Sequence, residues 1–71
     1  LTKLTNVAAS AWIGDSVVNY GDKTYTLAED VLCYNRDNGS WFESFSAAKA
    51  YGGKMDLYAK DGVIRAIEVR S

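Results

Sequence analysis

The segment KMDLYAKDGVIRAIEVR, residues 54–70, decides the fold because it is the clearest β-hairpin in the chain. Apolar and polar residues alternate along both of its arms. The arms are separated by Asp61-Gly62, a pair typical of tight turns between antiparallel strands. The sequence therefore predicts two paired strands at this end of the chain.

Two registers are possible for this hairpin. A two-residue turn at Asp61-Gly62 would pair Lys60 with Val63 and divide the apolar residues between the two faces. A three-residue loop over residues 60–62, with Gly62 as a left-handed bulge, would gather them on one face. We therefore predict the three-residue loop, with these residues facing the core: Met55, Leu57, Ala59, Val63, Ile67 and Val69.

A second hairpin is predicted in the N-terminal half. Residues 17–20 and 23–27 are rich in β-branched and aromatic residues and flank the turn pair Gly21-Asp22. A strand over roughly residues 3–13 would pair with the first of these arms after a turn at Gly14-Asp15.

One helix is predicted between the two hairpins. Ser40, followed three residues later by Glu43, forms a capping box. The apolar face of the helix repeats at i, i+4 and i+7, at Trp41, Phe45 and Ala48. Gly52-Gly53 supplies a left-handed stop. We expect about three turns, with Trp41 and Phe45 packed in the core.

These elements follow one another in the order β-β-β-α-β-β. After a break at residues 28–30, an extended stretch at residues 31–34 can continue the third strand. The order is that of an OB-type five-stranded barrel, in which the helix covers the open end. We therefore predict a mostly β (α+β) fold, a small OB-like barrel forming one domain over residues 1–71. The nearest alternative is a half-open barrel or a helix laid across a curled sheet.

Composition and charge exclude several functional classes. Eight basic and nine acidic residues are interspersed and give a net charge of −1. A nucleic-acid partner is not expected, because phosphate binding relies on clustered Lys and Arg. Membrane insertion is not expected either, because no apolar run approaches the roughly 20 residues that span a bilayer. Since the chain starts at Leu1 rather than Met, we expect a fragment of a longer protein.

The residue sets that enzymes and metal sites need are missing. The chain has no His, the commonest general base and metal ligand. Its single cysteine, Cys33, lies in an apolar strand and is expected to pack rather than react. Residues 35–39 resemble a calcium loop in composition, but Glu43 arrives at the ninth position instead of the twelfth. We therefore expect a non-enzyme with no catalytic, metal or cofactor site.

Aromatic residues are the richest feature of the chain. The alternation pattern leaves open which face of the sheet the strand tyrosines occupy. An exposed row of them could stack on sugars or bases, whereas cross-strand packing on a solvated face is the alternative. The candidate ligand surface consists of Tyr20, Tyr25, Tyr34 and Tyr58.

Two stretches, GDKTYTLAEDVLCYN at residues 21–35 and SWFESFSAAKAYGGKMDLYAKDGVIRAIEV at residues 40–69, carry a family resemblance. They resemble a module of Gram-positive bacterial surface proteins that often stands beside S-layer homology domains. The likeness covers about residues 17–69. It implies an extracellular, cell-wall-linked location and a spacer or adhesive role, and it brings no catalytic residues.

Two functional hypotheses follow. The first is a non-catalytic structural or interaction module of a bacterial cell-surface protein, whose partners are neighbouring domains of the same protein or cell-wall components. The alternative is an OB-type ligand-binding domain that uses the strand tyrosines to bind a glycan or single-stranded nucleic acid. Balanced charge counts against the nucleic-acid version.

Overall fold

The computed structural model describes all 71 residues, which form one mixed sheet and one α-helix. The fold is mostly β with a single helix, as predicted. The strands are β1 (Thr2–Ala8), β2 (Trp12–Ile13), β3 (Val17–Tyr20), β4 (Lys23–Asn35), β5 (Ser40–Trp41), β6 (Lys54–Lys60) and β7 (Val63–Arg70). The helices are the 3₁₀ turn η1 (Ala9–Ala11) and α1 (Phe45–Tyr51).

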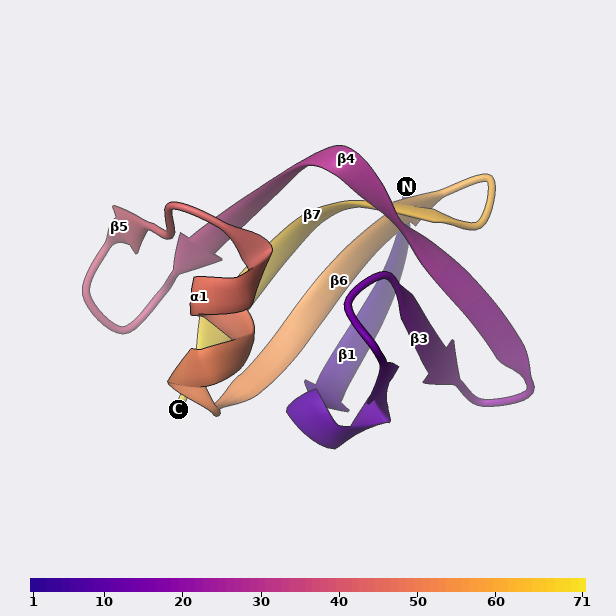
Figure 1. The fold of residues 1–71 in the computed structure, drawn as a ribbon, viewed down its shortest axis with the longest axis horizontal. Coiled ribbons are helices and arrows are strands. Elements are labelled where there is room, and N and C mark those ends of the chain that lie inside the picture. Colours follow the sequence, from indigo (N-terminus) through magenta and orange to yellow (C-terminus); the bar gives the residue numbers. More distant parts are fainter.

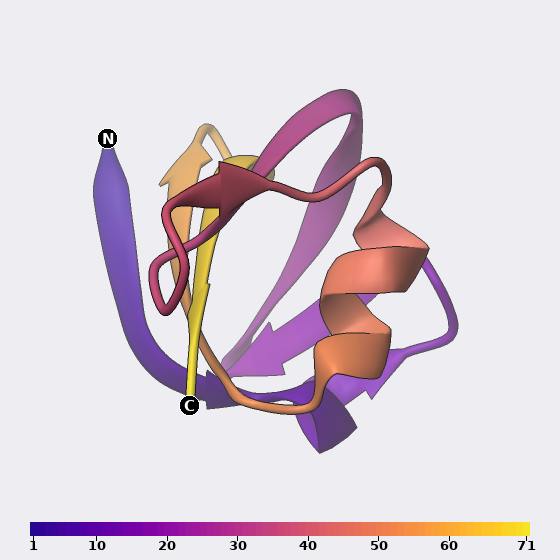
Figure 2. The ribbon, with the colours of Figure 1, turned by 90° about the vertical axis from the view of Figure 1, so that its left-hand side faces the viewer.

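The sheet has the strand order β1-β6-β7-β4-β3-β2, and β5 pairs with the end of β4. Neighbouring strands are antiparallel except β4 and β7, which are parallel. Viewed from the end that carries α1 and β5, the strands curl round a common centre (Figure 2). The two outermost strands, β1 and β2, follow each other in the chain and are joined by η1.

The predicted five-stranded barrel is therefore wrong in two respects. The sheet has seven strands, and it is open, because β1 and β2 do not pair with each other. The single strand predicted over residues 3–13 is interrupted by η1, which divides it between the two ends of the sheet. The alternative architecture given by the sequence, a helix laid across a curled sheet, describes the structure better than the barrel does.

Strand β4 is continuous through residues 28–30, where a break was predicted. It bends near its middle (Figure 1), and its ladder with β7 is irregular there: Leu27 pairs with Ile64, and the next pair is Leu32 with Ala66. Residues 28–31 therefore interrupt the pairing with β7 rather than the strand itself. The bend lets one half of β4 pair with β3 and the other half with β5.

The hairpin of β6 and β7 has the register that the sequence argument rejected. Asp61 and Gly62 have φ angles of 54° and 80°, and Lys60 pairs with Val63, so the turn has two residues. A bulge inside β7 brings the apolar residues back to one face of the sheet. At this bulge Ala59 pairs with Ile64, while the preceding residue, Tyr58, pairs with Ala66. Both Ile64 and Ile67 are consequently buried, while Val63 is only half-buried.

The helix also begins later than predicted. Its N-cap is Ser44, whose hydroxyl oxygen accepts a hydrogen bond from the Ala47 N–H at 3.2 Å. Ser40 lies in β5, so the Ser40–Glu43 capping box is wrong, and seven residues give about two turns instead of three. The predicted stop is confirmed, because Gly52 is left-handed at φ 83°.

The core lies inside the curled sheet and is closed by α1. It contains thirteen buried residues: Leu4, Val7, Trp12, Val18, Cys33, Phe45, Ala48, Met55, Leu57, Ala59, Ile64, Ile67 and Val69. The Trp12 ring packs on Phe45 with centroids 4.5 Å apart, and its indole N–H donates to the Met55 sulfur at 3.3 Å. Trp12 therefore takes the core position that was predicted for Trp41.

One buried polar cluster ties the sheet together on its outer face. Asp56 is 3% exposed and accepts a hydrogen bond from the Asn6 N–H at 3.1 Å. The guanidinium groups of Arg70 and Arg36 lie 3.6 Å and 3.7 Å from its carboxylate, and Arg70 also donates to the Asn6 side chain. Asn6 reaches this position at φ 57°, at an irregularity in the β1–β6 ladder. The cluster thus links four segments of chain through one carboxylate.

Candidate functional site

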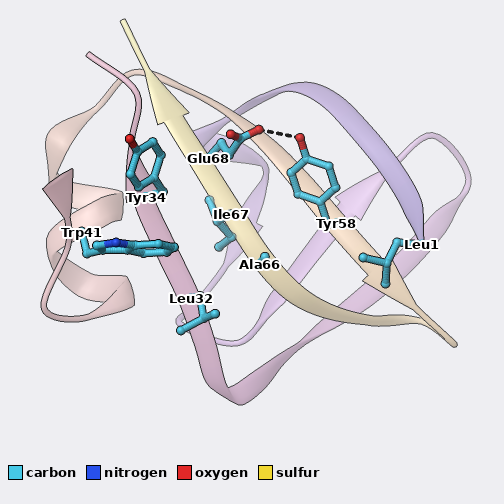
Figure 3. A pocket seen from close by; sticks show the side chains of 8 residues that line it. All are labelled: Leu1, Leu32, Tyr34, Trp41, Tyr58, Ala66, Ile67 and Glu68. Atoms are coloured by element: carbon cyan, nitrogen blue, oxygen red, sulfur yellow. Dashed lines mark hydrogen bonds between the residues drawn. The ribbon is translucent and has the colours of Figure 1, made fainter. Parts of the chain in front are cut away.

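The outer face of β4, β6 and β7 carries a groove of about 420 Å³, which we call the aromatic groove (Figure 3). It is lined by Leu1, Leu32, Tyr34, Trp41, Tyr58, Ala66, Ile67 and Glu68. All of these are apolar or aromatic except Glu68. The groove therefore offers a largely apolar surface with one carboxylate.

The floor of the groove follows from the strand register. Ala66 of β7 pairs with Leu32 of β4 on one side and with Tyr58 of β6 on the other. Because a single methyl group stands between two large side chains, the surface is hollow at this point. Two residues further along β7, Glu68 lies beside Tyr34.

One wall of the groove consists of Tyr34 and Trp41. β5 pairs Trp41 with Tyr34, and the two rings meet edge to face with centroids 4.9 Å apart. Trp41 is 62% exposed and Leu32 58% exposed, although both are strongly apolar. A group of exposed apolar side chains on a small domain is typical of a binding surface.

The opposite wall contains Tyr58, which is held by Glu68. The Tyr58 hydroxyl donates a hydrogen bond to Glu68 Oε1 at 2.5 Å (Figure 3). This hydrogen bond, together with partial burial, raises the pKa of Tyr58 above its ordinary value, because ionisation would place a phenolate beside a carboxylate. On the β1 side of Tyr58, the Lys3 ammonium lies 5.7 Å from the ring centroid.

We expect the pKa of Tyr58 to fall towards the ordinary tyrosine value in Glu68→Ala. The raised pKa in the folded state means that this interaction stabilises the protein fully below about pH 10 and is lost as pH rises through that raised pKa. NMR titration of ¹³Cζ-labelled tyrosine, which resolves each ring, measures the shift. An unchanged Tyr58 titration in the variant would contradict the role given to Glu68.

The structure brings two of the four candidate tyrosines together and places the other two elsewhere. Tyr34 and Tyr58 line the groove. Tyr25 packs against the core, and Tyr20 stands at the end of β3, outside the groove. Trp41 and Glu68 also line the groove, although neither was predicted as a site residue. Trp41 was assigned to a helix face, and Glu68 carried no signal beyond its place in an alternating strand.

The remaining chemically interesting side chains lie outside the groove. Cys33 is buried in the core, and burial raises the pKa of its thiol. No three His, Cys, Asp or Glu side chains lie close enough together to hold a metal ion. No helix is both long and apolar enough to cross a bilayer.

No protein-family model, curated protein or solved structure matches the chain.

Proposed function

We propose that the chain is a non-catalytic interaction module of a bacterial cell-surface protein, which binds a cell-wall component through the aromatic groove. The observation that carries this proposal is the exposure of Trp41 and Leu32 on one outer face, beside the half-buried Tyr34 and Tyr58. The core of thirteen residues is complete without them. Folding therefore gives no reason for this apolar surface, whereas binding does.

The size of the groove supports a small chemical group as its occupant. Its volume of about 420 Å³ lies within the range of roughly 300–1,000 Å³ that is typical of small-ligand sites. A stable interface with a neighbouring domain needs about 800 Å² and some 20–30 residues on each side. Eight lining residues are far fewer. A group carried by a cell-wall component fits these dimensions better than a domain surface.

The other parts of the proposal are supported by the sequence. The chain has no His, the commonest general base, and its only cysteine is buried with a raised thiol pKa, which disfavours thiolate catalysis. The cell-surface location is supported by the resemblance of residues 17–69 to a module of Gram-positive surface proteins.

A second candidate function is glycan binding, and one observation favours it. The exposed indole of Trp41 lies on the same face as a carboxylate, Glu68, that can accept hydrogen bonds from sugar hydroxyls. Single-stranded nucleic acid fits less well, because no Lys or Arg lines the groove to contact phosphate. Titration with neutral oligosaccharides tests this candidate, because saturable binding would identify the ligand of the groove as a glycan.

The proposal is tested by co-sedimentation with purified sacculi of a Gram-positive bacterium. We expect the wild-type chain to sediment with the sacculi and Trp41→Ser and Tyr58→Ser to lose most of this binding. Tyr20→Ser is the matched control, because it removes a partly exposed tyrosine outside the groove. Absence of wild-type binding, or equal binding by the groove variants, would refute the proposal.

A further inference from the structure

The rings of the groove are spaced to surround a cation. Tyr34 lies on β4 and Tyr58 on β6, with β7 between them. Neighbouring strands are about 4.8 Å apart, and Tyr58 and Tyr34 pair with Ala66 and Glu68, two residues apart along β7, so the two tyrosine positions lie roughly 12 Å apart on the sheet. A cation above β7 midway between them would lie roughly 6 Å from each position, which is about the distance over which aromatic rings attract cations. The hydrogen bond from Tyr58 to Glu68 orients this ring toward the row that contains Tyr34.

The charge within the groove also favours a cation. Glu68 is the only ionisable acid in the lining, and no Lys or Arg lines the groove. One of its carboxylate oxygens accepts the Tyr58 hydroxyl, and among the residues drawn in Figure 3 this is the only hydrogen bond. The second oxygen is available to a ligand. Lys3 approaches Tyr58 from β1, which lies on the other side of β6 from the floor of the groove.

We infer that the aromatic groove is a cage for a quaternary ammonium group of the choline type, enclosed by Tyr34, Trp41 and Tyr58 and neutralised by Glu68. A primary ammonium has three N–H donors that need acceptors, and the apolar lining offers little beyond one carboxylate. A quaternary ammonium has no donors and presents methyl groups to the rings. The inference rests on the groove being the binding surface proposed above, and it names the chemistry of the ligand.

The test is an NMR titration of the ¹⁵N-labelled chain with choline and with its neutral isostere, 3,3-dimethylbutan-1-ol. We expect choline to shift the Trp41 indole and the Ala66 and Glu68 amides in a saturable way. The isostere, which has the same shape without the charge, should bind at least about fivefold more weakly, as expected for the loss of one cation–π contact. Equal affinities, or no shifts with choline, would overturn the cage.

Variants separate the contributions of the Trp41 ring and of the Glu68 charge to the affinity for choline. Trp41→Leu should weaken choline binding at least about fivefold, and Trp41→Phe should weaken it less, because a ring is retained. Glu68→Gln keeps an acceptor for Tyr58 but removes the charge, so it should reduce the preference for choline over the isostere. Tyr20→Leu should bind choline like the wild type. Unchanged affinity in both Trp41→Leu and Glu68→Gln would also overturn the inference.

The failure of this inference can be told apart from failure of the proposed function. Binding to sacculi without binding to choline would overturn the cage and leave the interaction module standing. Binding to choline without binding to sacculi would support the cage and refute the cell-wall partner. Trp41 is largely exposed, so its variants should retain the fold, and unshifted amide signals from β1 would show this.

Discussion

Phe45→Ala is expected to lower the free energy of unfolding by about 3 kcal/mol, the usual cost of truncating a buried phenylalanine. Phe45 and Ala48 are the buried residues of α1, and the Phe45 ring packs on Trp12. A helix of seven residues is too short to be stable by itself. The change should therefore both create a cavity and loosen α1.

This loss is large for a chain of 71 residues, whose total stability is expected to be roughly 4–10 kcal/mol. Urea unfolding followed by circular dichroism measures it. Ser46→Ala is the control, because Ser46 is exposed on the same helix and its change should cost less than about 0.5 kcal/mol. A loss as small as this in Phe45→Ala would show that α1 is peripheral to the core.

Gly53→Ala is expected to destabilise the protein by about 3 kcal/mol or more. A Cβ atom at this position would lie 2.0 Å from the carbonyl oxygen of Arg70 and 2.8 Å from its carbonyl carbon. These are backbone atoms of β7, held in place by pairing with Lys54, so they cannot move aside as a flexible side chain would. Overpacking typically costs about 1–3 kcal/mol of stability. Because the clash at Gly53 is with backbone atoms, we expect a cost at or above the upper end of this range.

The neighbouring glycine provides the matched control. Gly52 has a φ of 83°, and the nearest atom to an added Cβ is 3.9 Å away. Gly52→Ala should therefore cost only about 1 kcal/mol of backbone strain. Thermal and urea unfolding of both variants test the order. If Gly52→Ala proved the more damaging change, the close approach of Gly53 to the end of β7 would be wrong.

The parts of the fold that local patterns control were predictable from the sequence. The turn at Gly21-Asp22 joins β3 and β4 as expected, and Gly52 ends the helix in the left-handed conformation. Gly62 has the positive φ that its turn requires. In each case a glycine and its neighbours decide the conformation within a few residues.

Features that depend on partners far away in the sequence could not be predicted in this way. The bulge that brings both Ile64 and Ile67 into the core depends on the pairing of a whole strand with β6. Two serines, Ser40 and Ser44, could each cap a helix. Ser44 is the N-cap of α1, because Ser40 pairs with Asn35 at the end of β4.

The candidate site was also predictable only where local sequence determines it. The strand tyrosines were recognised as candidate binding residues, and Tyr34 and Tyr58 do line the groove. Trp41 joins them only because β5 forms beside β4. The two walls face each other only because β7 inserts between β4 and β6, with parallel pairing to β4. No local alternation reveals a parallel pairing of this kind, since β5, α1 and β6 separate the two strands in the chain.

The central claim is that the parallel pairing of β4 with β7 builds the aromatic groove, and contacts of the Ala66 methyl group test it most directly. In a nuclear Overhauser experiment we expect this methyl group to contact Leu32 on one side and the Tyr58 ring on the other, because both residues pair with Ala66. We also expect it to show no contact with the core residue Met55. Contacts of Ala66 with Met55 and none with Leu32 would place this methyl group inside the sheet, and the groove would not exist.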